Sequence, residues 1–446
     1  MSDSRREFIK KAVAGTIGLT AGGTVLGTSA RSYSRIIGAN DIIRVAVIGT
    51  NSRGASMAGT FARQSGAEVS FICDVEDKAL QKGIDAVKNV TGKEPGRIKD
   101  FRKVLDNKDL DAIYIATPDH WHAPATILGL KAGKHVYVEK PLSHDPLEGE
   151  MVVKAAGKYN RVVQMGNQRR SWPTLAQGIQ ELKDGIIGRV YMDKGWYVNT
   201  RASIGTGKVV PVPSNLDYEL WQGPAPRRPY KDNLIHYNWH WFWHWGTGEA
   251  LNNGTHEIDV IRWGLGLDYP VKVNSAGGRY HYKDDWETPD TQVITFDAPG
   301  SVIYWEGRCC NGSLVDCRSR GVIFYGENGA MHTGDNSYVI YDNKNKLVKD
   351  VKSDTLTTNG QNTTSPGEDL DAVHVINFFD CIRNNKKPHS DVLNGHKSTL
   401  WVQLGNIAQR VGHTLNIDQS NGHISGDQEA MKLWSREYEK GWEPTV

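Results

Sequence analysis

The fold is predicted from one stretch, residues 42–57, which reads IIRVAVIGTNSRGASM. Its first half is a run of β-branched residues that indicates a buried strand, and its second half predicts a helix. Between them, Gly49 and Gly54 occupy the first and third glycine positions of a dinucleotide-binding turn. Glycines there permit a sharp bend and a close approach to pyrophosphate, whose charge attracts the free amides of the next helix. The stretch therefore predicts a dinucleotide loop, with Ser52 and Arg53 among its contacts.

Asn51 holds the middle position of this loop, where a glycine is usual. We expect it to be tolerated because asparagine adopts left-handed backbone angles more readily than most residues. Asp74 ends the next apolar run, where a carboxylate can bind ribose hydroxyls and would repel a 2′-phosphate. Arg53 carries a guanidinium that could reach such a phosphate. NAD is thus the expected cofactor, and NADP stays open.

The first part of the chain alternates between strand and helix patterns. Apolar, β-rich runs fall at 42–49, 68–75, 111–117, 134–140 and 161–167, and helical stretches at 52–64, 77–90 and 124–132 lie between the first four. Such alternation is typical of a doubly wound parallel sheet in an α/β protein. We therefore predict an NAD(P)-binding Rossmann domain over residues 42–166.

The pattern changes in residues 167–446. Aromatic and β-branched runs at 188–200, 291–298, 301–307, 321–333 and 337–343 predict a large, mostly antiparallel sheet. Amphipathic patterns at 371–383 and 398–412 predict helices, and the polar stretch 352–367 predicts a surface loop. These patterns predict a second, α+β domain, which the family resemblance described below implies is the substrate and oligomerisation domain.

The first thirty residues resemble a twin-arginine export signal. SRREFIK, residues 4–10, carries the arginine pair Arg5 and Arg6 and precedes a small-residue apolar run that ends at Ala30. A membrane anchor is the alternative, but a run rich in Gly, Ala and Thr has low membrane affinity. We expect residues 1–30 to be a signal peptide, 31–41 a linker, and the protein to be periplasmic or otherwise exported. Because such signals mark proteins exported already folded, a tightly held cofactor is expected.

The composition favours a small neutral ligand. The 446 residues carry a formal charge of +2 without a long run of one sign, so neither nucleic acid nor a stable membrane contact is expected. The five cysteines lack metal-finger spacing and are interpreted as free thiols.

One segment gathers aromatic side chains. Residues 238–245 read NWHWFWHW and hold four of the fourteen tryptophans, which either line a sugar site or form a core hairpin. His236, His240 and His244 recur at intervals of four, a spacing that suits metal ligands. Their neighbours are mostly aromatic, so we expect hydrogen-bonded histidines and no metal.

Three motifs together with the glycine loop resemble the glucose-fructose oxidoreductase and inositol dehydrogenase family (Gfo/Idh/MocA). They are ATPDHWH at 116–122, VEKPLSHD at 138–145 and GTHEIDVIRW at 254–263, and the resemblance spans residues 41–412. It implies a Rossmann domain followed by an open-faced sheet through which subunits form homo-oligomers, dimers or tetramers.

The resemblance also implies roles for individual residues. Lys140 would stand between nicotinamide and substrate, and His256 would be the catalytic histidine. An aspartate usually stands four residues before that histidine, but here the position is Asn252, which cannot exchange a proton. Tyr197 resembles a tyrosine near the reacting carbons in the NAD-dependent glycosidase branch. Further cofactor contacts are expected at Thr117, Pro118, His122, Glu139, Pro141 and Asn167, and sugar contacts at Arg169, Trp172, His240, Trp241 and Asn252.

Three functions follow from these residues. The leading hypothesis is hydride transfer from a carbohydrate or polyol carbon to NAD, with His256 accepting the hydroxyl proton, Lys140 stabilising the alkoxide and Tyr197 sharing the transfer. The alternative is an NAD-dependent glycoside hydrolase or lyase that oxidises the sugar, eliminates the leaving group, adds water and reduces the sugar again. The third is a sugar-binding protein that has lost its chemistry.

Overall fold

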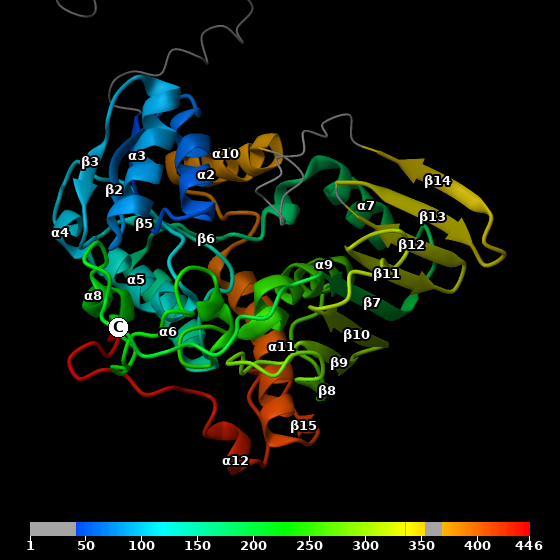
Figure 1. Ribbon diagram of the computed structural model, residues 1–446. Coiled ribbons are helices and arrows are strands. Elements are labelled where there is room, and N and C mark those ends of the chain that lie inside the picture. The colour runs from blue at the N-terminus through cyan, green and yellow to red at the C-terminus, as the bar shows by residue number, and fades with distance from the viewer. Residues whose placement is uncertain (1–41, 335, 353–367) are drawn as a thin grey trace, which may run out of the picture. The chain divides into compact units, whose positions relative to one another are not determined.

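The computed structural model describes residues 42–334, 336–352 and 368–446, and the expected signal peptide and linker lie outside them. The first sheet has six strands in the order β3-β2-β1-β4-β5-β6, and all neighbours are parallel (Figure 1). The predicted doubly wound sheet is therefore confirmed. Its strands are β1 (Ile43–Ile48), β2 (Ala67–Cys73), β3 (Gly96–Ile98), β4 (Ala112–Ile115), β5 (His135–Val138) and β6 (Val163–Met165).

Helices connect these strands and cover the sheet. They are α2 (Arg53–Ala62), α3 (Asp77–Thr91), α4 (Arg102–Leu105), α5 (Asp119–Lys131) and α6 (Pro146–Tyr159). Apolar β-branched strands such as β1 and β4 are buried along almost their whole length, as expected for a sheet covered on both faces. Strand β3 and helices α4 and α6 have no counterpart in the predicted elements.

The start of α5 corrects the sequence analysis, which placed this helix at residues 124–132. The helix begins at Asp119 and carries Pro124 inside it. Proline lacks an N–H group, so it cannot bond to the carbonyl of the residue four positions earlier. That carbonyl belongs to His120, and it accepts a hydrogen bond from Arg436 Nη2 at 2.6 Å instead. A distant arginine thus satisfies the group that the proline leaves open.

The second sheet has nine strands in the order β14-β13-β12-β11-β7-β10-β9-β8-β15. All neighbours are antiparallel except β7 and β10, so the predicted mostly antiparallel sheet is confirmed. The strands are β7 (Val190–Val198), β8 (Lys272–Gly278), β9 (Thr291–Ala298), β10 (Ser301–Arg308), β11 (Arg320–Gly326), β12 (Gly329–Thr333), β13 (Tyr338–Asp342), β14 (Leu347–Val351) and β15 (Leu415–Asn416).

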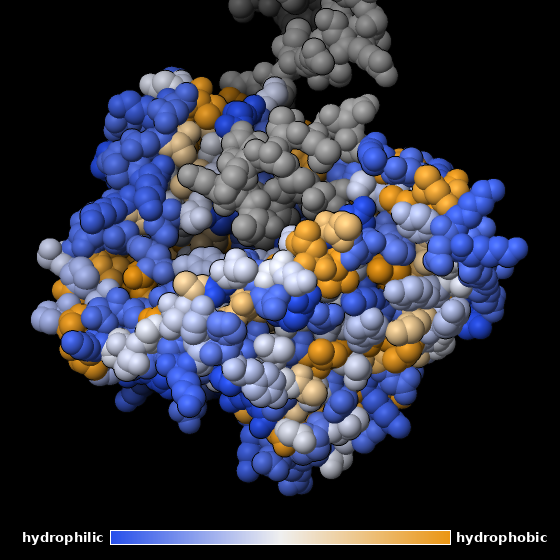
Figure 2. Space-filling view, turned by 45° about the vertical axis from the view of Figure 1, so that its right-hand side comes forward, coloured by the Kyte–Doolittle hydropathy of each residue, from blue (hydrophilic) through white to orange (hydrophobic). Residues whose placement is uncertain are grey.

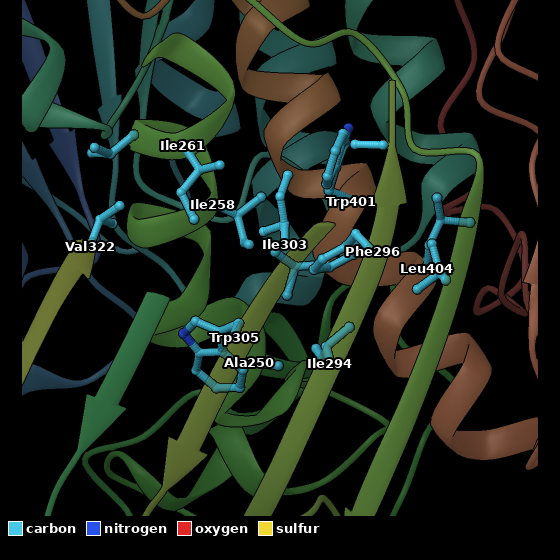
Figure 3. Close-up of a cluster of buried hydrophobic side chains, with 14 of the residues drawn as sticks. Ala250, Ile258, Ile261, Ile294, Phe296, Ile303, Trp305, Val322, Trp401 and Leu404 are labelled. Carbon is cyan, nitrogen blue, oxygen red and sulfur yellow. The ribbon is translucent and has the colours of Figure 1, made fainter. Parts of the chain in front are cut away.

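Helices cover one face of this sheet and form the largest core with it. Figure 3 shows Ile294, Phe296 and Ile303 from the strands packed against Ile258 of α9 and Trp401 of α11. The helical elements of this half are α7 (Pro173–Lys183), α8 (Tyr218–Gln222), α9 (Thr255–Leu265), α10 (Glu368–Asn384), α11 (Val392–Val411) and α12 (Gln428–Met431), with a π-helical turn η5 (Ala250–Gly254) and 3₁₀ turns η3 (Gln168–Ser171) and η4 (Asn238–Trp241).

Parts of the later sequence return to the first sheet. Helix α10 packs on α2 (Figure 1). Its Val375, Phe378 and Phe379 share a core with strands β1 and β4. Near the end of the chain, Trp442 and Val446 pack against the other core of the first sheet. The first sheet is therefore completed by residues more than 200 positions away.

The surface in Figure 2 carries scattered hydrophobic groups among hydrophilic residues. In the described part of the chain, no helix combines the length and the apolar character needed to cross a membrane. Most of the predicted loop at 352–367 lies outside the described residues.

Candidate functional site

A crevice of about 510 Å³ opens where the strands of the first sheet end. One wall consists of the residues that follow β1, β2, β4 and β5, which is where open α/β sheets bind ligands. The facing wall comes from segments of residues 201–252. Twelve predicted site residues line the crevice: Gly49, Asn51, Ser52, Arg53, Asp74, Thr117, Pro118, His122, Glu139, Lys140, His240 and Asn252.

The glycine loop bends as the motif requires. Gly49 has a φ of 83°, and a Cβ atom there would lie 2.6 Å from the carbonyl oxygen of Ala116. A Cβ on Gly54 would lie 1.7 Å from the Gly49 oxygen, which excludes every larger side chain. Asn51 does not use the left-handed angles that we expected, since its φ is not positive. Its side-chain oxygen instead accepts a hydrogen bond from Lys82 Nζ at 2.7 Å.

Asp74 is fixed at the end of β2. Its carboxylate accepts hydrogen bonds from the backbone N–H of Thr50 at 2.6 Å and of Glu76 at 3.0 Å. Arg53 is held elsewhere, because its guanidinium makes a bidentate contact with Asp371 at 2.7 and 3.0 Å and bonds Glu139 at 3.0 Å. The cation near the loop is thus neutralised by two carboxylates.

The ATPDHWH loop presents polar groups to the crevice. Thr117 Oγ1 is buried and has no hydrogen-bond partner among the described residues. The two ring nitrogens of His122 lie 2.6 Å from the carbonyl oxygen of Pro141 and 2.9 Å from that of Thr117. His122 therefore links this loop to the segment that follows β5.

Lys140 joins the two walls. Its Nζ donates to the backbone oxygen of Asn252 at 2.6 Å and to Oδ1 of the same residue at 2.8 Å. Burial lowers the pKa of Lys140, against the raising effect of the carboxylates of Glu139 and Asp119. The ammonium therefore loses its proton more readily than an exposed lysine does.

A buried ion pair between Arg201 and Glu249 helps to hold Asn252 in place. Glu249 pairs with Arg201, accepts a hydrogen bond from Asn252 Nδ2 at 3.2 Å, and bonds Asn253. Burial alone would raise the pKa of Glu249, but the Arg201 guanidinium outweighs it and lowers the pKa. Arg201 lines the crevice and lies 3.5 Å from the hydroxyl of Tyr197.

The aromatic segment divides between the crevice and the interior. His240 stacks on Trp239 with ring centroids 3.6 Å apart, and both line the crevice together with Tyr237. The Nδ1 atom of His240 lies 2.6 Å from the carbonyl oxygen of Tyr237, so this nitrogen carries the hydrogen and leaves Nε2 as an acceptor. Burial holds the pKa of His240 well below its usual range. The segment is a 3₁₀ turn and loop rather than the core hairpin considered as an alternative.

The three spaced histidines have separate partners. His236 pairs with Glu76 at 3.0 Å, and His244 Nε2 lies 2.7 Å from the carbonyl oxygen of Pro226. In the described ranges, no group of three or more His, Cys, Asp or Glu side chains is arranged to hold a metal.

Eight predicted site residues do not line the crevice: Gly54, Pro141, Asn167, Arg169, Trp172, Tyr197, Trp241 and His256. Arg169 and Trp172 are buried beneath it, and Trp241 stacks on Trp286 with centroids 3.9 Å apart. His256 is 1% exposed, and neither of its ring nitrogens has a hydrogen-bond partner in the described part of the chain. Burial, and after it the charges of Arg320 and Lys140, hold the pKa of His256 well below its usual range.

Several crevice residues have no counterpart in the sequence analysis. Glu76 lies two residues after Asp74, and Asp119 and Trp121 lie within the ATPDHWH motif, so their positions in the sequence could have indicated that they line the crevice. Arg201, Leu220, Trp221 and Tyr237 come from a stretch without a motif. Only long-range contacts such as Glu76–His236 and the backbone bond from Asp77 N to Asn215 O bring that stretch over the crevice.

Two family models match the chain. One, described as an oxidoreductase family with an NAD-binding Rossmann fold, matches residues 43–167. The other, described as the C-terminal alpha/beta domain of an oxidoreductase family, matches residues 195–308 and 317–444. The matched ranges contain both walls of the crevice.

Curated relatives match over part of their length. The chain is 30% identical over 211 residues to a glycosyl hydrolase family 109 protein of Saccharopolyspora erythraea. The aligned region covers 44% of this chain and 46% of that protein. It is 28% identical over 210 residues to a glycosyl hydrolase family 109 protein of Shewanella baltica, again 44% of this chain and 46% of the relative. The match thus spans about half the length of these relatives.

Solved structures share the fold. A levoglucosan dehydrogenase in complex with NADH superposes with a TM-score of 0.66 at 17% identity, over 84% of this chain and 99% of that one. The WlbA dehydrogenase of Bordetella pertussis, in complex with NADH and UDP-GlcNAcA, gives a TM-score of 0.62 at 20% identity over the same shares.

Proposed function

Because the chain belongs to the Gfo/Idh/MocA oxidoreductase family, we propose that it transfers a hydride between a carbohydrate carbon and NAD held in the crevice. The observation that supports this most directly is the contact of Lys140 with Asn252, which puts one titratable group where the two walls meet. The third hypothesis, a binding protein without chemistry, does not account for a lysine whose pKa is lowered in this position.

The crevice residues fit an adenine dinucleotide. The glycine loop and the start of α2 would hold the pyrophosphate, Asp74 the ribose hydroxyls, and the unpartnered Thr117 hydroxyl a polar group of the nicotinamide half. Arg53 is occupied by Asp371 and Glu139, so a 2′-phosphate would meet Asp74 without a free guanidinium from Arg53. These contacts favour NAD over NADP.

A bound nicotinamide would supply a hydride acceptor or donor for the reacting carbon. Lys140 would stabilise negative charge on the substrate oxygen through its ammonium. His240 offers an Nε2 lone pair on the crevice wall, and therefore suits the hydroxyl hydrogen better than His256, which does not line the crevice. Tyr197 contacts Arg201, the partner of Glu249 in the buried ion pair, and would help to position the Arg201 guanidinium.

The aromatic wall supports a carbohydrate substrate. Trp239 and Tyr237 offer apolar ring faces beside the hydrogen-bonding groups of His240 and Asn252, which suits a ring with C–H and O–H groups. The names of the relatives also support it, since levoglucosan dehydrogenase and glycosyl hydrolase family 109 both refer to sugars.

The second candidate is redox-neutral glycoside cleavage, favoured by the match to glycosyl hydrolase family 109 proteins. Here the sugar carbon would give its hydride to bound NAD and become a ketone, the adjacent C–H would lose its proton, and the glycosidic group would leave with a proton. Water would then add, and the carbon would take the same hydride back. Residues 201–240, which we call the covering segment, supply most of the facing wall of the crevice. Glu76 supports this second candidate, because its contacts with His236 and Asn215 hold the covering segment over the crevice and would retain the cofactor.

One experiment tests both candidates. The purified protein is denatured and its extract analysed by mass spectrometry, and we expect NAD. The intact protein is then given aryl glycosides without added NAD, or free sugars with NAD, and the Lys140→Met variant serves as the inactive control. Release of the aglycone supports cleavage, and NADH formation from free sugars supports net oxidation. Absence of any dinucleotide in the extract and in binding assays contradicts both.

We also propose that the protein is exported and forms homo-oligomers. Val293 and Val302 point outward from neighbouring strands of the second sheet and are exposed, which supports a contact through that face. Light scattering of the purified protein and of a Val302→Lys variant tests the contact, and fractionation of cells that carry Arg5→Lys and Arg6→Lys tests export. A monomeric wild type, or unchanged export, would contradict the respective proposal.

A further inference from the structure

A second cavity of about 200 Å³ lies between the start of α6, residues 243–251, helix α11 and the segment 433–436. It shares no lining residue with the crevice. Arg410 and Ser435 line this cavity and are exposed, so the cavity reaches the molecular surface. At roughly 30 Å³ for each water molecule, the volume equals about seven waters, which is room for one small ring.

Unpartnered polar groups line this cavity. Gln403 is 3% exposed, and its Oε1 has no hydrogen-bond partner in the described chain, while its Nε2 is held by the carbonyl oxygen of Ser143 at 3.1 Å. Among the residues that the structure describes, neither ring nitrogen of His144 has a hydrogen-bond partner, nor does Arg436 Nη1, although Arg436 is fixed by Glu148 at 2.6 Å. Buried polar groups without partners are rare and costly, so a ligand or water must complete them.

The mixture of these groups identifies the class of ligand. Arg436 Nη1 can only donate, Gln403 Oε1 can only accept, and a neutral imidazole at His144 does one of each. An anion would meet Gln403 Oε1 and the Asp145 carboxylate, and a cation would meet Arg436. A hydroxyl group both donates and accepts, so neighbouring hydroxyls satisfy all of these groups.

The remaining wall is apolar and includes a tryptophan. Trp243, Leu251, Ile407 and Leu433 line the cavity. Trp243 lies four residues after Trp239, which lines the crevice, so the same aromatic segment supplies an indole to each site. The Arg410 guanidinium lies over one face of the Trp243 ring, 5.1 Å from its centroid, so the opposite face of the indole is the one left to pack against the C–H groups of a sugar ring.

We infer that this second cavity binds one neutral polyol of monosaccharide size. The site is independent of the reaction proposed for the crevice, but the two are in contact. Thr247 lines the cavity and donates to the Asp119 carboxylate of the crevice at 2.5 Å, and Leu251 precedes the Asn252 that holds Lys140. Occupancy of the cavity therefore acts on the segment that positions the lysine.

The test measures sugar binding to the purified holoprotein. D-glucose, N-acetyl-D-galactosamine and myo-inositol are titrated by calorimetry, with sodium acetate and sodium sulfate as anionic probes. Hydrogen exchange then reports which segments a sugar protects. We expect protection of residues 243–251 and 403–410, and a loss of at least about tenfold in affinity for Trp243→Leu and for the cavity-filling Leu433→Trp.

Trp239→Leu is the matched control, since it removes the same side chain from the crevice and leaves the second cavity intact. The inference is overturned if no sugar protects those segments, if only the anions bind there, or if Leu433→Trp folds normally and keeps every sugar affinity. Failure of the reaction proposed for the crevice would leave these binding results unchanged, so the two proposals fail separately.

Discussion

The six-stranded sheet reaches the crevice with the ends of its strands, whereas the nine-stranded sheet reaches it only through segments that leave its strands. Asp74 and Lys140 follow β2 and β5 directly, but Arg201, His240 and Asn252 lie in loops and short helices. None of the described strand residues of the second sheet lines the crevice. Strand ends position one wall, and long-range side-chain contacts position the other.

The largest effect is expected at Lys140, where the two walls meet. Lys140→Met removes the ammonium and its bonds to Asn252, and kcat/KM should fall about 10³-fold because loss of one group that stabilises a developing oxyanion costs about 10²–10³. Bound NAD should remain, as the glycine loop is untouched. Steady-state kinetics and NAD content measure both, with Lys99→Met as a control lysine that also lines the crevice. Near-normal turnover would remove Lys140 from the chemistry.

A substitution at Glu249 tests whether side-chain contacts stabilise the facing wall of the crevice, which comes from residues 201–252. Glu249→Ala leaves the buried Arg201 without its carboxylate, and the free energy of unfolding should fall by about 3 kcal/mol. Urea denaturation measures this. The double variant Glu249→Ala with Arg201→Met should recover part of the loss, since no charge is then left buried alone. Equal stability of the wild type and the single variant would show that the pair does not hold this wall.

Asp193 tests the second sheet away from the crevice. Burial raises the pKa of Asp193 to about 7 from 3.8, against a hydrogen bond from Ser301 Oγ at 2.6 Å. Between these pH values the folded state binds more protons than the unfolded state, so stability falls as pH rises through the window.

Asp193→Asn lacks this titration and should be more stable than the wild type by about 4 kcal/mol above pH 7, with no difference in kcat. Thermal unfolding at several pH values measures it. A parallel pH dependence of the two proteins would contradict the assignment.

The smallest effect is expected at His236, which fastens the covering segment. His236→Leu removes a partly exposed hydrogen-bonding contact with Glu76, worth under about 1 kcal/mol, so NAD release should quicken about threefold. Stopped-flow release of the cofactor measures it, and His281→Leu serves as a control in an exposed loop. An unchanged rate would mean that the covering segment closes without this pair.

The two walls also differ in how far the sequence predicts them. Gly49, Asp74 and Lys140 line the crevice because strand ends of a parallel sheet share one edge, so local pattern fixes their position. His256 and Trp172 stand in equally clear patterns, yet neither lines the crevice. The first turn of α9 buries His256, and Trp172 packs into the core of the second sheet, so tertiary packing excludes both side chains from the crevice. Arg201 and Tyr237 depend on partners such as Glu249, and no local signal encodes those pairings.

Helix α5 shows the same limit on a smaller scale. The helical pattern predicted at 124–132 begins at Pro124, but the helix begins at Asp119, and Arg436 donates the hydrogen bond to the His120 carbonyl that the proline cannot donate. A residue more than 300 positions away thus permits the longer helix.

The return of α10 and Trp442 to the first sheet sets an order of events during protein synthesis. A ribosome releases the glycine loop and all six strands long before it makes Phe378 and Trp442, which complete the cores around them. The nascent Rossmann domain therefore stays incompletely packed until residues 375–446 have also been made. Loss of the last few dozen residues would leave an aggregation-prone intermediate, however complete the binding motif is.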